Sequence, residues 1–99
     1  MAKVTFSLNL QVSIIKEGDK FIAYAPALDL STFGNSLEEA KKRFTEVVEI
    51  FFEEVSKART LEEVLKDLGW TKVQSKKGGW VPPTVVSQGS QIFQVPLYN

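Results

Sequence analysis

The sequence contains neither histidine nor cysteine in its 99 residues, and these two absences remove much of the usual catalytic chemistry. Without histidine, no Ser–His or Cys–His nucleophile system can form, and no imidazole is present to bind a metal ion. Without cysteine there is no thiolate, and the missing disulfide framework favours a reducing compartment. We therefore predict a protein that is not an enzyme and that has no metal or other cofactor.

Long apolar runs are also missing, since no stretch approaches the roughly 20 residues that cross a bilayer. Lys3 is followed by alternating residues rather than by a continuous apolar run, so no secretion signal is visible. The pair Gly78 and Gly79 belongs to no phosphate-binding or dinucleotide-binding motif and indicates a turn. These features predict a cytoplasmic protein that binds no membrane.

The chain has 12 basic and 12 acidic residues, so it has no overall basic field that would hold nucleic acid. The charges are unevenly spread along the chain. Residues 1–69 carry 9 basic and 12 acidic side chains, whereas residues 70–99 carry lysines but no acidic residue. The predicted helices lie in the acidic part, which would suit a basic partner.

Apolar and polar residues alternate over residues 4–14, and this period of two predicts a long strand with one buried face. A short loop containing Gly18 leads to a second apolar run at 21–25, which predicts a β-hairpin. Pro26 should end the second strand, because proline cannot donate a hydrogen bond to a sheet ladder. A third short strand is expected over residues 28–33.

Two capping-box patterns predict two helices. Ser36 and Glu39 have the spacing at which each side chain can bond the other's backbone N–H, and Thr60 and Glu63 repeat it. The second helix should be short and stop at Gly69. The first should be long and pack on the sheet, because its apolar residues form one stripe at the helical period: Leu37, Ala40, Phe44, Val47, Val48, Phe51, Phe52 and Val55.

The part after residue 69 has a β-like composition with interruptions. Residues 70–74 and 80–81 should form strands around a turn, and Pro82-Pro83 forces an extended or irregular path. The apolar residues of 92–97 either complete the sheet or reach over a partner subunit. We predict a single α+β domain over 1–99, in which 70–99 is a β-rich extension. Its two layers are an antiparallel sheet of three N-terminal strands plus C-terminal strands, and one long and one short helix.

Three glutamates of the long helix are the first candidate site. Glu46, Glu49 and Glu53 share one helical face through their spacing of three and seven residues. Such carboxylates can bind a hard cation or act as acid and base, but an ordinary solvated helix surface has the same pattern. The third interpretation is an acidic docking surface, and we take these residues as candidate partner contacts.

Aromatic and basic residues of the predicted C-terminal hairpin are the second candidate site. Aromatic side chains interleaved with lysines can bind single-stranded nucleic acid by stacking on its bases. The residues concerned are Trp70, Lys72, Lys76, Lys77 and Trp80. The alternative is that the two tryptophans fill the edge of the core or a subunit interface, where aromatic side chains usually lie.

Three segments together match a known family pattern: the strand at 21–26 with its aromatic residue and closing proline, the turn and helix start at 34–40, and the long helix. Through them, residues 11–69 resemble the HicB-like antitoxin family. The resemblance implies a three-strand meander with a helix across it and at least one more strand. This is a reduced relative of the RNase H fold without its catalytic carboxylates.

Members of this family typically bind a small ribonuclease toxin and mask its active surface, and many carry a C-terminal DNA-binding module. This chain departs from the family at Asp29-Leu30-Ser31, where Pro-Gly-Cys is frequent. Residues 70–99 also contain no plausible helix for a DNA-binding module. We therefore do not expect this chain alone to bind operator DNA.

The leading hypothesis is a prokaryotic HicB-like antitoxin, or an orphan relative, that neutralises a basic HicA-like ribonuclease toxin encoded nearby. One alternative is a toxin-independent regulatory or structural module that forms a homodimer or higher homo-oligomer, because exposed strand edges need covering. A second is a weak nucleic-acid binder acting through the Trp70–Trp80 hairpin. A third, a residual hydrolase, would rest on Asp29 with Glu38 or Glu39 near the strand-to-helix junction.

Overall fold

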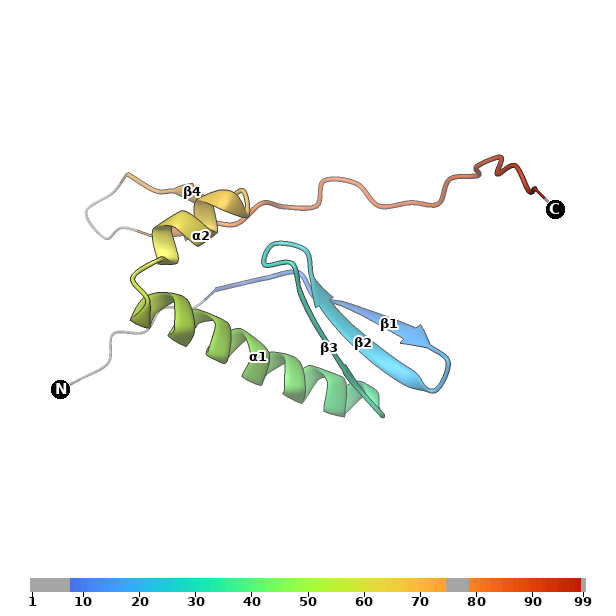
Figure 1. Cartoon of the computed structure of the whole chain (residues 1–99), viewed down its shortest axis with the longest axis horizontal. Coiled ribbons are helices and arrows are strands. Elements are labelled where there is room, and N and C mark those ends of the chain that lie inside the picture. Colours follow the sequence, from blue (N-terminus) through green and yellow to red (C-terminus); the bar gives the residue numbers. More distant parts are fainter. Residues whose placement is uncertain (1–7, 75–78, 99) are drawn as a thin grey trace.

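A two-residue turn at Gly18 and Asp19 folds the first two strands into a hairpin, with Gly18 at a left-handed φ of +61°. The computed structural model describes residues 8–74 and 79–98. Its main sheet is an antiparallel meander in the order β1-β2-β3 (Figure 1), formed by β1 at Ser13–Glu17, β2 at Lys20–Ala25 and β3 at Leu30–Gly34. The predicted hairpin and three-strand arrangement are confirmed.

The first strand lies later in the chain than the alternation predicted. Residues 8–12 form no strand, and residues 4–7 of the predicted strand lie outside the described part of the chain. The neighbouring strand explains why β1 begins at Ser13. Ser13 pairs with Tyr24, and β2 ends at Ala25, the residue after Tyr24. Pro26 cannot donate to a ladder, so residues 8–12 have no strand beside them.

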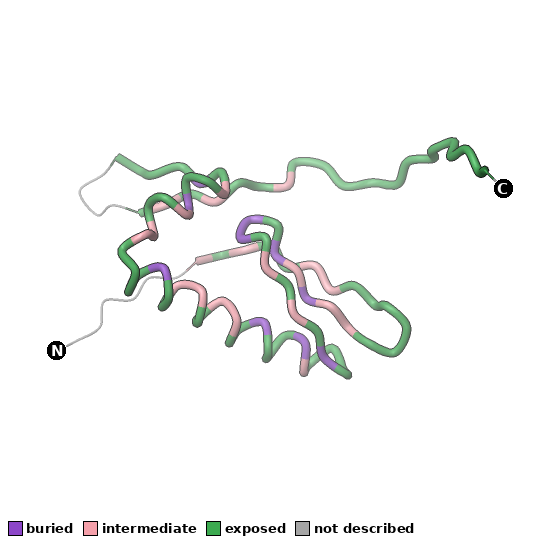
Figure 2. Tube along the Cα trace, in the orientation of Figure 1, coloured by how far each residue is buried: buried purple, intermediate pink, exposed green. Residues whose placement is uncertain are grey.

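The side chains of β2 divide the sheet into an inner and an outer face. Ala23 and Ala25 are fully buried against the helix layer, whereas Ile22 and Tyr24 alternate with them and remain partly exposed. The inner face packs with Ala40 and Phe44 of the long helix to form the first core cluster. Figure 2 shows buried residues on the facing sides of sheet and helix. The predicted two-layer α+β arrangement is therefore present.

The long helix α1 spans Leu37–Lys57 and begins as its capping residues predict. The Glu39 backbone N–H donates to the Ser36 hydroxyl at 3.1 Å. The return bond differs from the predicted capping box, because the Glu39 carboxylate accepts from the N–H of Asn35 at 3.0 Å instead of that of Ser36. Both bonds satisfy N–H groups at or just before the helix start, and Glu39 is also favourable near the positive end of the helix.

Close contact between β3 and the start of α1 depends on Gly34. A Cβ atom at this position would lie 2.5 Å from the backbone nitrogen of Ala40 and 2.9 Å from its Cα. Backbone atoms cannot move aside as a flexible side chain can, so any larger residue here would push the helix off the sheet. Gly34 therefore sets the separation of the two layers at this end of the molecule.

The short helix α2, Leu61–Asp67, belongs to a second core cluster formed with the β2–β3 loop. Leu65 packs there with Ala27, Leu28 and Trp70, all of them buried. The indole Nε1–H of Trp70 donates to the carbonyl oxygen of Ala27 at 2.7 Å. This bond joins the C-terminal third of the chain to the loop that precedes β3.

The ends of α2 agree only in part with the sequence. Thr60 precedes the helix, but its side chain makes no capping hydrogen bond, so the prediction of a second capping box is wrong. Its φ and ψ of −112° and 9° lie outside the extended conformation that a side-chain cap normally adopts. Gly69 follows the helix at a φ of +90°, as its predicted role of stop residue requires.

The C-terminal strands do not extend the main sheet. Thr71–Lys72 (β4) and Trp80–Val81 (β5) pair with each other in a separate two-stranded sheet. The predicted hairpin over 70–81 is confirmed, although its strands are shorter than expected. Residues 82–98 belong to neither sheet, so within the described chain the apolar residues of 92–97 complete no sheet.

The segment after β5 leaves the body of the protein as an extended chain (Figure 1). The molecule measures 61 × 30 × 24 Å, and its Cα radius of gyration is 17.1 Å, against about 13 Å for a compact chain of 100 residues. Residues 86–98, which we call the C-terminal segment, are exposed along their whole length (Figure 2). The segment accounts for the elongated shape.

Replacement of Gly34 by alanine should destabilise the protein by about 1–3 kcal/mol, because the added methyl group meets the backbone of Ala40. Urea-induced unfolding followed by circular dichroism measures the effect. Gly89→Ala is the matched control, since a Cβ at Gly89 meets nothing within 4 Å. Equal midpoints for the two variants would contradict the close approach described here.

Replacement of Trp70 by phenylalanine should cost about 1–3 kcal/mol, because it removes the donor and leaves the buried carbonyl of Ala27 without its partner. Trp80→Phe, in which a half-buried ring is replaced, should cost less. Chemical denaturation of both variants, monitored by circular dichroism, provides the comparison. A larger loss at Trp80 would show that the Trp70 bond does not anchor the hairpin.

Candidate functional site

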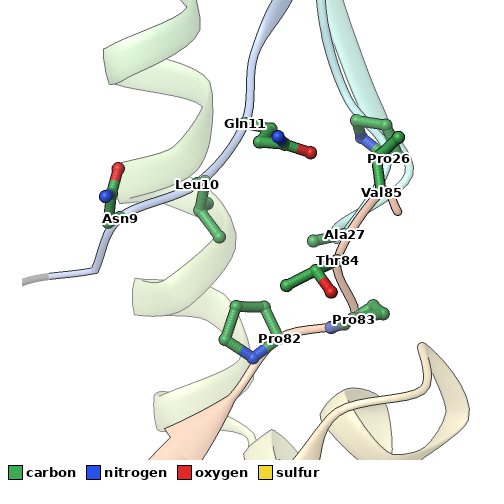
Figure 3. Close-up of a pocket in the computed structure, with 9 residues that line it drawn as sticks. All are labelled: Asn9, Leu10, Gln11, Pro26, Ala27, Pro82, Pro83, Thr84 and Val85. Carbon is green, nitrogen blue, oxygen red and sulfur yellow. The ribbon is translucent and has the colours of Figure 1, made fainter. Parts of the chain in front are cut away.

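The described chain offers grooves and open faces rather than an enclosed chamber. One groove lies where residues 82–85 cross residues 9–11 and the start of the β2–β3 loop (Figure 3). Its volume is about 40 Å³, whereas small-molecule sites usually measure about 300–1,000 Å³. This groove has room for little more than a water molecule. It marks the crossing of two chain segments.

Over residues 8–74 and 79–98, no group of three or more acidic side chains is placed to hold a metal ion. None of the helices in these same ranges combines the length and apolarity that spanning a bilayer requires.

The candidate contacts Glu46, Glu49 and Glu53 are exposed on α1. At 100° per residue they lie on the side of the helix opposite to the buried Ala40, Phe44 and Val55. This acidic face therefore points away from the sheet, as its sequence spacing predicted.

Ile50 lies on the same side of α1 and is 59% exposed. Its spacing of four residues from Glu46 and three from Glu53 places it beside these two carboxylates. Around the helix axis Ile50 lies about 40° beyond Glu46, so it borders the acidic face on one side. Sequence reasoning grouped the three glutamates but missed Ile50, whose spacing from Glu46 and Glu53 was the available signal.

The charges of the acidic face are only partly neutralised. Lys57 pairs with Glu53 at 2.8 Å, and the hydrogen bond that the Lys57 ammonium donates to this carboxylate raises the pKa of Lys57. Glu46 and Glu49 form no ion pair with any residue in the described ranges. Two negative charges therefore remain available on this side of the helix.

The candidate nucleic-acid site is divided by the fold. Trp70 is only 4% exposed and its ring belongs to the core, so it presents no face on which a base could stack. Trp80 is half-buried, and the ammonium of Lys72 lies 5.9 Å from its ring centroid. Lys76 and Lys77 lie outside the described residues. Trp70 therefore packs in the core, which is the alternative interpretation of the two tryptophans.

Lys72 is further engaged by α2. Its ammonium lies 3.7 Å from the carboxylate of Glu62, which also pairs with Lys66 at 3.2 Å. The hydrogen bond from Lys66, followed by the charge of Lys72, lowers the pKa of Glu62. Lys72 thus bridges the hairpin and α2, and its charge is shared with an acidic neighbour.

The acids of the hydrolase alternative do not come together. Asp29 precedes β3, whereas Glu38 and Glu39 follow its other end, so a strand of five residues, about 17 Å, separates them. Glu39 is engaged with Asn35 and with Arg43 at 3.3 Å. Asp29 accepts a hydrogen bond from the Tyr24 hydroxyl at 3.2 Å.

The outer face of the main sheet carries an apolar row that sequence analysis did not identify. Ile15 is paired with Ile22, and Ile22 with Phe33, so these side chains line up directly across the three strands. Ile15 is 48% exposed and Phe33 is 54% exposed. We call these three residues the open row. An open depression of about 450 Å³ over this row is lined by Glu17, Lys20, Ile22, Ser31, Thr32 and Phe33.

Arg43 reaches from α1 around the β3 edge of this sheet. It donates to the carbonyl oxygen of Phe33 at 3.0 Å, and its guanidinium lies 5.8 Å from the Phe33 ring centroid. This side chain therefore occupies part of the β3 edge. The open row itself remains exposed between the two sheet edges.

Comparison with known proteins adds no relative. No family model, no curated protein and no solved structure matches the chain.

The Tyr24–Asp29 contact has a measurable consequence. Loss of solvent around the phenol, then the hydrogen bond and negative charge of Asp29, raise the pKa of Tyr24. In a Tyr98→Phe background Tyr24 is the single tyrosine, so ultraviolet absorbance can follow its titration. Asp29→Asn should lower this pKa without fully restoring an ordinary value, because desolvation remains. An identical titration curve in the Asp29→Asn variant would argue against the contact.

Proposed function

We propose that this chain is a stoichiometric inhibitor of the HicB-like antitoxin type, which binds a small basic ribonuclease and masks its surface. The observation that carries the proposal is the acidic face of α1, with the exposed Ile50 at its border. Binding of this kind needs only a complementary surface. It requires no catalytic group from the inhibitor.

The composition of the acidic face suits a protein partner. Interfaces combine apolar and polar contacts, and Ile50 adds an exposed apolar side chain at the border of the glutamates. The unpaired charges of Glu46 and Glu49 would attract a basic surface. Complementary charge accelerates encounter more than it tightens a complex, which suits an inhibitor that must capture a nuclease before it cuts RNA.

The resemblance of residues 11–69 to HicB-like antitoxins supports this choice of partner class. The three-strand meander crossed by α1 is the arrangement that the resemblance implies. Cytoplasmic location, a prokaryotic source and a toxin gene nearby are parts of the same proposal. The 70–81 hairpin favours no separate nucleic-acid function, because Trp70 is buried and Lys72 is paired.

The test mixes the purified chain with the small basic protein encoded beside it. Size-exclusion chromatography with light scattering detects the complex, and ribonuclease activity is assayed on the same fractions. We expect a mixed complex with silenced cleavage. The double variant Glu46→Lys/Glu49→Lys should associate at least about tenfold more slowly, because attraction becomes repulsion.

Glu63→Lys/Glu17→Lys is the matched control, since it makes the same change in net charge at exposed positions away from the acidic face. This control should bind and inhibit as the unmodified chain does. If the unmodified chain leaves cleavage unaffected, the inhibitor proposal fails. Equal slowing by both double variants would instead remove the acidic face as the contact.

A further inference from the structure

The C-terminal segment carries large apolar side chains that nothing in the described chain covers. Ile92 and Leu97 are each 89% exposed, and Val86, Phe93, Val95 and Tyr98 are also exposed. An apolar group of this kind normally marks an interaction site. We therefore expect these apolar side chains to pack on another surface.

The pattern of the segment fits an extended conformation. Phe93, Val95 and Leu97 alternate with Gln94 and Pro96, so in an extended chain these three side chains would point to one side. Residues 91–98 would span about 25 Å when extended. This length is sufficient to cross a sheet of three short strands.

The open row is the matching surface. It is apolar, three strands wide and flanked by Ser13, Ser31 and Tyr24 on the same face. Its charged neighbours include Glu17 and Lys20, which stand opposite each other at the hairpin end, and Arg43, whose guanidinium lies 5.8 Å from the Phe33 ring centroid. Residues 79–98 contain no charged side chain. An uncharged apolar segment can therefore cover the three apolar side chains without adding charge beside them, whereas Lys20 and Arg43 would repel a basic partner.

The C-terminal segment of this chain packs on no surface, and the open row of the same chain is covered by no segment. Val85 lines the groove beside Pro26 and Ala27, and beyond it the segment runs away from the body (Figures 1 and 3). Two copies can each supply what the other lacks, and a two-fold exchange closes without leaving a free end. Reciprocal docking also doubles the buried area, which counts because stable interfaces bury about 1,200–2,000 Å² in total.

We propose that the C-terminal segment of one copy packs across the open row of a second copy, and the reverse, so that the protein is a segment-exchanged homodimer. Phe93, Val95 and Leu97 face Ile15, Ile22 and Phe33 of the other copy. The acidic face of α1 takes no part. The dimer is therefore independent of the proposed inhibitor function, and each can fail without the other.

The absence of native cysteine allows a direct test by engineered disulfides. Ser31→Cys lies beside the open row, and Val95→Cys lies on the side of the segment that faces this row in the proposed packing. The two single variants, one of them tagged, are mixed and oxidised at micromolar concentration. We expect a mixed disulfide dimer to exceed either same-residue dimer at least about tenfold. A chain carrying both cysteines should form mainly linked dimers, whereas mainly internally bridged monomers would overturn the proposal.

Apolar-to-charged variants provide the second measurement. Phe33→Lys and Leu97→Lys should each weaken the dimer at least about tenfold in Kd, measured by sedimentation velocity. Val81→Lys is the control, because Val81 is exposed to about the same extent as Phe33 and lies outside the proposed contact. Leu97 is exposed and supports no part of the fold, so its variant remains informative if Phe33→Lys unfolds. A chain that is monomeric throughout the micromolar range, before any substitution, would refute the exchange.

Discussion

The bond from the Trp70 indole to the carbonyl oxygen of Ala27 is the contact on which the arrangement of the C-terminal third depends. It joins residues 43 positions apart, and it lies in a cluster with Leu28 and Leu65. This cluster shares Leu30 and Val48 with the cluster beneath the sheet, so the two cores are continuous. The β4–β5 hairpin is thereby held beside the β2–β3 loop. The direction in which the C-terminal segment leaves follows from that placement.

The two-layer arrangement separates the two proposed binding surfaces. α1 covers the inner face of the sheet, and its acidic face points away from that sheet. The open row lies on the outer face of the sheet, on the far side of the molecule from those glutamates. A copy whose open row is covered therefore keeps its acidic face accessible. Under these proposals, dimerisation and capture of a basic partner are compatible.

The candidate site was only partly predictable. Helical spacing alone placed Glu46, Glu49 and Glu53 on one face, because an exposed helix obeys its period wherever it packs. The sequence could not show that Trp70 is more buried than Trp80, because the burial of these side chains depends on a loop far away in the sequence. The open row was missed for a related reason. Ile15, Ile22 and Phe33 lie in different strands, and their alignment follows from register and from which face the helix covers.

Local patterns by themselves determined the hairpin at Gly18, the end of β2 before Pro26, the start of α1 at its Ser36 cap and the stop at Gly69. Each of these depends on backbone preferences within a few residues. Tertiary structure alone decided that the alternation over residues 8–12 yields no strand, that β4 and β5 form their own sheet and that Trp70 is buried. A strand requires a neighbour with free ladder groups, and burial requires an opposing surface. Both are supplied by distant parts of the chain, which no local pattern encodes.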